Sequence, residues 1–259
     1  MTKDALDRLY RRFNRRRYVH PDPLEFLYAY PDLRDREIVG LIASSLAYGR
    51  VAQILSSVRR VLDRLGPSPC AFLMETSPKS LARVLAPFKH RFTTGQELAE
   101  LLSGVRDAVA RHGSLNRCFV AGYDDADETV LPALERFAGE IAGRRTYLLP
   151  CPAAGSACKR MNLYLRWMVR KDAVDPGGWA GVPRAKLVAP LDTHMARIGR
   201  ALGFTKRKAA NLGMALDITR AFRRFSPGDP VKYDFALTRF GIRGELDVEE
   251  LVGTLKIVD

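Results

Sequence analysis

The sequence lacks the features that mark secreted, membrane-spanning and metal-cluster proteins. Its four cysteines, Cys70, Cys118, Cys151 and Cys158, do not have the spacing of a disulfide framework, a zinc site or an iron–sulfur site. No apolar run approaches the roughly 20 residues of a membrane-spanning helix. The charged N-terminus, MTKDALDRLYRRF, has no apolar core of the signal-peptide kind. We therefore expect a cytoplasmic protein with reduced thiols, no membrane partner, and no metal or cofactor.

Strand signals are also scarce. The sequence contains no run of alternating β-branched residues and no Asn-Gly or Asp-Gly hairpin turn. Apolar residues recur instead at three- and four-residue spacing, as at Leu6, Tyr10 and Phe13. With 259 residues, of which 47% are hydrophobic, the chain can bury a sizeable core. These features predict an all-α protein whose short helices pack orthogonally, at many angles.

Proline and glycine set the expected helix boundaries. Pro21-Asp22-Pro23 should break the chain after a first helix, Gly49 should separate two helices within residues 32–65, and Gly66-Pro67 should end the second. Residues 175–190, rich in proline and glycine, should form a loop. A short helix or turn is expected at 23–30, and further helices are expected at 69–75, 78–85, 94–112, 114–122, 129–144, 156–171, 193–202, 206–225, 230–239 and 248–255.

The charge is strongly unbalanced, since 42 Lys and Arg against 29 Asp and Glu give a formal net charge of +13. Residues 159–224 hold fifteen Lys and Arg against four Asp, which gives this segment a net charge of +11. A second basic cluster lies near the N-terminus and consists of Arg8, Arg11, Arg12, Arg15, Arg16 and Arg17. Two such clusters favour a nucleic acid over a membrane as the partner, although each is also compatible with a solvated cationic surface.

Two residues in the larger basic segment have the chemistry of a catalytic pair. Lys159 stands at the start of an expected helix, and Asp192 precedes another helix 33 positions further on. A lysine becomes nucleophilic when it loses its proton, which desolvation and nearby cations such as Arg160 and Arg166 favour. A carboxylate that caps a helix can also stabilise a sugar cation. On local sequence alone, Lys159 can also be an ordinary surface lysine and Asp192 a simple cap.

The residues around this pair resemble the helix-hairpin-helix DNA glycosylases. Leu191-Asp192-Thr193-His194, followed by a helix that runs on to Leu202-Gly203, resembles their Val-Asp-Thr-His stretch with its catalytic aspartate. Residues 155–159, Gly-Ser-Ala-Cys-Lys, resemble the hairpin turn and the helix start that carries the Schiff-base lysine of bifunctional members. The separation of lysine and aspartate is closer to that of the archaeal 8-oxoguanine DNA glycosylase branch than to that of the endonuclease III branch.

The chain resembles still more closely an uncharacterised bacterial family, a domain of unknown function. The stretches that carry this resemblance are Gly-Ser-Ala-Cys-Lys-Arg, Leu-Arg-Trp-Met-Val-Arg-Lys-Asp, Pro-Leu-Asp-Thr-His, and residues 229–237. Residues 42–50 fall where the glycosylases carry a helix end that probes the base pair, with Leu46 or Ala47 in place of their glutamine.

The glycosylase resemblance implies a fold and a reaction. Residues 24–145 would form one helical subdomain of a single domain, and residues 1–23 with 146–259 the other, with a basic cleft between them. A damaged base, such as an oxidised purine, would be flipped out of double-stranded DNA into this cleft. Lys159 would then attack the sugar C1′ while Asp192 stabilises the positive charge. The protein would be a monomeric bifunctional DNA glycosylase/AP lyase of base-excision repair.

The same resemblance implies a nucleic-acid-binding set around the catalytic pair. Trp179, in the glycine-rich loop, is a candidate to stack on the extruded base, and its alternative role is to anchor that loop to the core. His194 can instead make a helix-start hydrogen bond, and the basic residues can be plain surface charge. A non-catalytic DNA- or RNA-binding protein on the same scaffold is the alternative function. The expected contacts are Gly155, Ser156, Ala157, Arg160, Arg166, His194, Lys206, Arg207 and Lys208.

Overall fold

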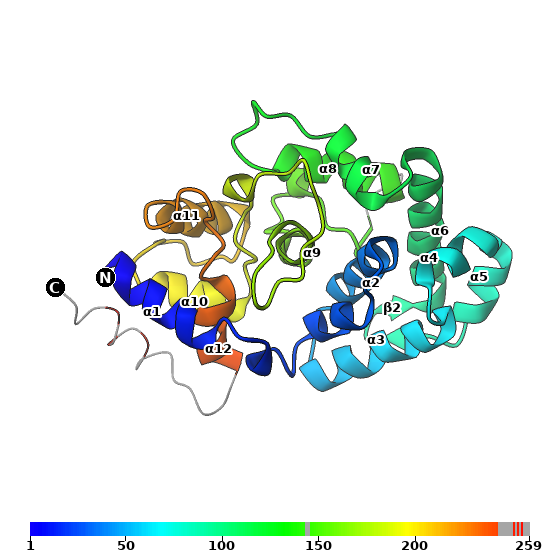
Figure 1. The fold of residues 1–259 in the computed structure, drawn as a ribbon, viewed down its shortest axis with the longest axis horizontal. Coiled ribbons are helices and arrows are strands. Elements are labelled where there is room, and N and C mark those ends of the chain that lie inside the picture. The colour runs from blue at the N-terminus through cyan, green and yellow to red at the C-terminus, as the bar shows by residue number, and fades with distance from the viewer. Residues whose placement is uncertain (143–145, 243–250, 252, 254, 256–259) are drawn as a thin grey trace.

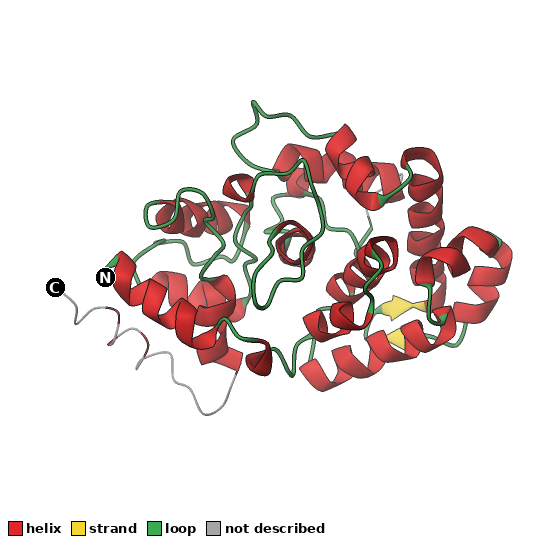
Figure 2. Ribbon diagram, viewed as in Figure 1, coloured by secondary structure: helices red, strands yellow, loops and turns green. Residues whose placement is uncertain are grey.

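The computed structural model describes residues 1–142, 146–242, 251, 253 and 255, and these residues are predominantly helical (Figures 1 and 2). The predicted all-α class is confirmed. Two-residue strands, β1 (Lys89–His90) and β2 (Thr93–Thr94), pair antiparallel in a short hairpin that the sequence did not predict. Within the described ranges, no helix combines the length and apolarity that a membrane crossing requires.

One group of helices comes from residues 23–142 and lies on the right of Figure 1. At its centre, α6 contacts α4, α5, α7 and α8. α2 is buried along most of its length and contacts both η2 and α9. The group consists of the 3-10 helix η2 (Pro23–Ala29), α2 (Leu33–Ser45), α3 (Val51–Leu65), α4 (Pro69–Glu75), α5 (Pro78–Leu85), α6 (Gly95–His112), α7 (Leu115–Ala121) and α8 (Leu131–Ala142).

A second group combines the two ends of the described chain on the left of Figure 1. α1 (Lys3–Phe13) packs against α12 (Asp234–Ile242), and α12 packs against α10 (Thr193–Ala201). An ion pair between Lys232 Nζ and Asp7, at 2.6 Å, joins the N-terminal helix to the segment before α12. The remaining elements outside the first group are the 3-10 helices η1 (Arg16–Tyr18), η3 (Pro152–Ala154) and η4 (Arg184–Lys186), and α11 (Leu212–Arg223).

Helix α9 (Lys159–Val169) lies between the two groups and packs on α2. All but two of its residues are buried. The loop that follows turns back over its C-terminal end, where Gly177 N–H donates to Trp167 O at 3.0 Å and Trp179 N–H donates to Met168 O at 2.9 Å. Gly177 has a φ of 64° and its Cβ would lie 2.7 Å from Arg170 O, so glycine is required for this closure. The loop thereby satisfies carbonyl groups that a helix end leaves free.

Buried ion pairs fix α9 to its surroundings. Arg166 is 3% exposed and pairs with Asp175, at 3.1 Å, and with Asp234 at the start of α12. Arg170 is equally buried and pairs with Asp172, at 2.9 Å, with Asp175, and with Asp229 at 3.0 Å. Buried cations need such partners, because an unpaired charge is costly in a low-dielectric interior. Both arginines therefore serve the interior of the protein.

Several helix ends differ from their predicted positions because of local capping. The helix predicted over 156–171 begins at Lys159, because Cys158 is left-handed, with a φ of 46°. The helix predicted over 206–225 begins at Leu212, because the Asn211 side chain accepts the Met214 N–H at 3.1 Å. The helix predicted over 230–239 spans Asp234–Ile242. The helix predicted over 248–255 lies mostly outside the described residues.

The predicted helix boundaries at Gly49 and Gly66 are confirmed. Gly49 has a φ of 95° and stands between α2 and α3, and Gly66, with a φ of 76°, ends α3. The segment after Pro21-Asp22-Pro23 is a 3-10 helix, capped by the Asp22 side chain on Leu24 N–H at 3.0 Å.

Candidate functional site

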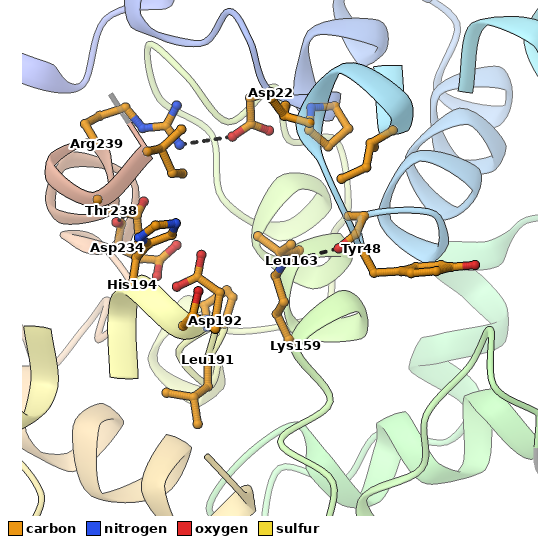
Figure 3. A pocket seen from close by; sticks show the side chains of 18 of the residues that line it. Asp22, Tyr48, Lys159, Leu163, Leu191, Asp192, His194, Asp234, Thr238 and Arg239 are labelled. Atoms are coloured by element: carbon orange, nitrogen blue, oxygen red, sulfur yellow. Dashed lines mark hydrogen bonds and ion pairs between the residues drawn. The ribbon is translucent and has the colours of Figure 1, made fainter. Parts of the chain in front are cut away.

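The two helical groups and α9 line a pocket of about 640 Å³ (Figure 3). The start of α9 contributes Lys159, and the start of α10 contributes Asp192. The turn between α2 and α3 contributes Ala47, Tyr48 and Gly49. A volume of this size is typical of small-molecule sites and is large enough for a nucleobase.

Lys159 is the first residue of α9 and is partly exposed. Its Nζ donates to the carbonyl oxygen of Ala47 at 3.2 Å, across the boundary between α9 and the α2–α3 turn. No ion pair joins Nζ to a carboxylate among the residues that the structure describes. The amine is thus held by a neutral acceptor and keeps donor capacity for a ligand, since an ammonium group has three N–H donors.

Asp192 is the N-cap of α10, as predicted. Its Oδ1 accepts the Met195 N–H at 2.7 Å, which fixes the side chain at the helix start. Its Oδ2 has no hydrogen-bond partner within the described part of the chain. Figure 3 shows Asp192 and Lys159 on opposite walls of the pocket, with both side chains reaching into it.

The wall that carries Asp192 also holds His194, Asp234 and Arg239 (Figure 3). The His194 ring lies against α12, where a Cβ at Gly241 would be only 2.2 Å from its Nδ1. Arg239 is 2% exposed and pairs with Asp22 at 3.1 Å. This ion pair joins α12 to the segment before η2.

The charges that line the pocket balance one another. Among the described lining residues there are three acidic and three basic side chains. Two of the cations, Arg166 and Arg239, are already paired with Asp234 and Asp22. The prediction of a basic cleft is therefore wrong for the pocket itself, and the excess of positive charge lies outside it. The acidic members are Asp22, Asp192 and Asp234, and the basic members are Lys159, Arg166 and Arg239.

Asp234 has an unusual environment. It is 2% exposed, and its Oδ2 accepts from Arg166 while its Oδ1 is buried without a hydrogen-bond partner among the described residues. Burial raises the pKa of its carboxyl group to about 6, with Arg166 opposing the rise and Asp192 adding to it. Asp234 is thus a carboxyl group that holds its proton more readily than an exposed aspartate.

Two arginines predicted to contact nucleic acid serve the interior instead. Arg160 is 8% exposed, and its guanidinium donates to Ser45 O at 2.9 Å and to Tyr147 O. Arg166 is held in the ion pairs described above. The prediction of phosphate contacts is therefore wrong for both, because the apolar helix that carries them is buried and their charges require internal partners.

The predicted stacking role of Trp179 is also wrong, and the alternative of a loop anchor is correct. Its side chain is 7% exposed, and its ring lies 5.2 Å from Tyr164, 5.5 Å from Phe119 and 6.2 Å from Phe137, between ring centroids. Trp179 fixes the loop after α9 to the core formed by α7, α8 and α9.

The turn before α9 and the loop before α11 meet on the surface. Gly155 is exposed, with a φ of 71°, and its carbonyl accepts the Leu212 N–H at 3.1 Å. Ser156 and Ala157 are partly exposed, but they precede α9 and do not form its first turn. Lys206 and Lys208 are exposed in the adjoining loop. The neighbouring Arg207 pairs with Asp217 at 2.9 Å, through a side chain that remains largely exposed.

Cys158 precedes Lys159 but is an inert thiol. It is 1% exposed, its Sγ donates to Pro150 O at 3.3 Å, and burial raises its pKa to about 11. All four cysteines of the chain are free.

Most of the side chains that line the pocket escaped sequence reasoning. A buried arginine in an apolar helix signals a carboxylate partner, which could have pointed to Asp234. No local signal marks the others, because their place in the pocket arises from packing between distant segments. Neither Leu46 nor Ala47, at 0% and 3% exposure, projects outward as a base-pair probe. The missed side chains include Asp22, Tyr48, Leu163, Asp234 and Arg239.

Comparisons with known proteins bear on the family of the chain. Searches of curated proteins and of solved structures find no match. A family model described as "Protein of unknown function (DUF2400)" matches residues 22–243. The matched range includes the pocket-lining residues from Asp22 to Ile242, with Lys159 and Asp192. The predicted membership in a family of unknown function is thereby confirmed, and the chain belongs to the DUF2400 family.

Proposed function

We propose that this protein is a bifunctional DNA glycosylase/AP lyase of base-excision repair. The observation that carries the proposal is that Lys159 and Asp192, from two different helix starts, line one pocket large enough for a nucleobase. An amine and a carboxylate in such a pocket suit attack on a sugar carbon that develops positive charge. The resemblance to the helix-hairpin-helix glycosylases supports the same assignment.

In the proposed reaction, a damaged base leaves the duplex and enters the pocket. Lys159 Nζ, once deprotonated and released from Ala47 O, attacks C1′ of the sugar, and the bond from C1′ to the base nitrogen breaks. The free Oδ2 of Asp192 faces the positive charge that develops on the sugar. Loss of a proton from Nζ and opening of the sugar ring give an imine, from which elimination of the 3′ phosphate cleaves the strand.

Contacts to the DNA backbone would come from the surface where the turn before α9 meets the loop before α11. Gly155, Lys206 and Lys208 are exposed there. Backbone N–H groups and lysines are common phosphate ligands and position a duplex without reading its sequence. In this proposal, residues 152–158 and the start of α9 take the place of the glycosylase hairpin.

Borohydride trapping tests the proposal, because it reduces an imine between a lysine and an abasic sugar to a stable covalent adduct. We expect the wild-type protein to give an adduct with duplex DNA that carries an abasic site, and Lys159→Gln to give none. Lys171→Gln is the matched control, since Lys171 is an exposed lysine two positions beyond α9. Melting curves for both variants report whether the fold is intact. Absence of an adduct from wild-type protein that binds the same DNA contradicts the lyase.

The exposed cations outside the pocket favour a second candidate, a non-catalytic protein that binds DNA or RNA. Lys206 and Lys208 have no acidic partner among the described residues, so they are available to phosphates. In this case affinity falls with salt and with loss of these lysines, while Lys159→Gln leaves binding unchanged and no adduct forms. Parallel binding to RNA and DNA duplexes of one sequence distinguishes the two polymers.

A further inference from the structure

The pocket brings a second carboxyl group next to Asp192. Asp234 comes from α12, whereas Asp192 comes from the start of α10, and Figure 3 shows both on the same wall. Their environments differ. Asp192 is partly exposed and accepts a backbone N–H, whereas Asp234 is 2% exposed, with Oδ1 unpartnered among the described residues.

A buried carboxylate oxygen without a donor is unfavourable, because it has lost its water and gained nothing in return. A proton on Oδ1 removes that cost and turns the oxygen into a donor. The charged groups around Asp234 act in both directions: Arg166 from α9 and Arg239 from α12 favour the anion, while Asp192 and Asp175 favour the neutral form. Two neighbouring carboxyl groups in unequal environments are the arrangement that divides acid and base roles in many enzymes.

Resting on the proposed glycosylase function, we infer that Asp234 is the general acid that protonates the departing base. As the bond from Nζ to C1′ forms, the bond from C1′ to the base nitrogen breaks and its electron pair stays with the base. The base reaches the buried Asp234 Oδ1 by displacing the side chains around it. The proton on this oxygen then passes to the base, which leaves as a neutral molecule. The carboxylate that remains is stabilised by Arg166, already bonded to its Oδ2.

The proton balance closes through solvent. The attacking amine becomes a cationic secondary amine, which must lose a proton before the sugar ring opens to the imine. Water takes up this proton and returns one to the Asp234 carboxylate, so that formation of the imine does not require the acid. Asp192 stabilises the sugar cation. General acids of this kind contribute about 10²- to 10⁴-fold to a rate.

The test separates base excision from imine formation, because an abasic site has no base to protonate. We expect Asp234→Asn to slow excision of a damaged base by about 10²-fold or more. Borohydride trapping on abasic DNA should stay within about two-fold of wild type, because that step involves Lys159 and not the acid. An equal loss of excision and trapping, with wild type active, overturns the assignment.

Asp175→Asn is the matched control for a purely structural role. Asp175 is the other carboxylate bonded to Arg166, is 0% exposed, and does not line the pocket. We expect this variant to lower the melting temperature without separating excision from trapping. A separation of the two activities in Asp175→Asn equal to that in Asp234→Asn overturns the role of Asp234 as acid.

A measurement on the wild-type protein keeps the inference testable where Asp234→Asn does not fold. Excision rates are compared for a series of bases whose leaving nitrogens differ in basicity. With an acid in place, the rate should depend weakly on the basicity of the leaving group, and a steep dependence overturns the inference. Failure of wild type to trap or excise at all overturns both the glycosylase proposal and the role of Asp234.

Discussion

At the scale of single residues, the pocket depends on polar side chains whose partners lie far away in the sequence. The sequence predicts that Arg166, in an otherwise apolar helix, needs a partner, and the structure supplies Asp234, 68 positions away. The sequence alone does not reveal that this ion pair keeps Arg166 away from any nucleic-acid interface. The positions of Lys159 and Asp192 were predictable because both lie at helix starts, which are local features of the sequence.

Glu37 gives the stability of the protein a predictable pH dependence. It is 1% exposed on α2, where it accepts the N–H groups of Leu115 and Asn116 at the start of α7, at 3.1 and 2.9 Å. Burial raises the pKa of its carboxyl from 4.5 to about 7, against the lowering effect of these hydrogen bonds. A raised carboxyl pKa means that the folded state binds the proton more tightly, so the contribution of Glu37 to stability falls as pH rises from about 4.5 to about 7.

We therefore expect Glu37→Gln to remove part of this decline. The free energy of unfolding of wild type relative to the variant should decrease by roughly 3 kcal/mol across that range. Urea unfolding at pH 4.5, 5.5, 6.5 and 7.5 measures the free energy of unfolding of both proteins. The difference between them cancels the contributions of other titrating groups, such as Asp234, because both proteins contain these groups. A wild-type-minus-variant difference that does not change with pH contradicts the expectation.

At the scale of elements, helix positions were predictable, and so were both ends of α4 and α5, whereas the ends of α9, α11 and α12 were not. Lys206, Arg207 and Lys208 are good helix formers, so their pattern predicted a helix from residue 206. In the structure Thr205 Oγ1 accepts the Arg207 N–H at 3.2 Å, and α11 begins only after the Asn211 cap. Such side-chain-to-backbone bonds compete with the helix and decide the boundary.

Close helix packing sets a second, element-scale expectation at Gly104. A Cβ at this position of α6 would lie 1.8 Å from the backbone oxygen of Ile141 in α8, so alanine must push the two helices apart. We expect Gly104→Ala to destabilise the protein by about 1–3 kcal/mol. Gly139→Ala is the control, because Gly139 is an exposed residue of α8 with open space at its Cβ.

The control should stabilise the protein by up to about 1 kcal/mol, through the higher helix propensity of alanine. Thermal melts followed by circular dichroism at 222 nm compare the two variants. Equal melting temperatures for Gly104→Ala and wild type would mean that α6 and α8 separate without cost.

At the scale of the whole molecule, the charge and the fold class were predictable from composition and periodicity. The location of the charge was not. The pocket lining is balanced in charge among the described residues, because three carboxylates from distant segments meet three cations there. Convergence of residues such as Asp22 and Arg239 depends on how the two helical groups pack, which no local pattern encodes.

The exposed lysines before α11 lead to an expectation about salt dependence. Each phosphate contact contributes about −0.9 to the slope of log K against log salt concentration. We expect Lys206→Ala with Lys208→Ala to reduce the magnitude of this slope by about 2 for duplex DNA. The double variant Lys79→Ala with Lys89→Ala, at exposed positions of α5 and β1, removes the same charge and should leave the slope within about half a unit of wild type.

Fluorescence anisotropy with a labelled duplex, between 50 and 300 mM salt, measures both slopes. Equal reductions in the two double variants would indicate a response to net charge and not to a specific surface.

The buried thiol of Cys158 has a practical consequence for watching the pocket at work. Because Cys158 is 1% exposed and immediately precedes Lys159, a thiol-reactive dye reaches it only when the start of α9 separates from its surroundings. In a protein with Cys151→Ser, which leaves three buried thiols, the labelling rate reports how often the interior opens. Mass spectrometry of the labelled peptides assigns the rate to each cysteine. If damaged DNA slows the labelling of Cys158 and leaves the labelling of Cys70 and Cys118 unchanged, the decrease reports, in real time, occupation of the pocket beside Cys158.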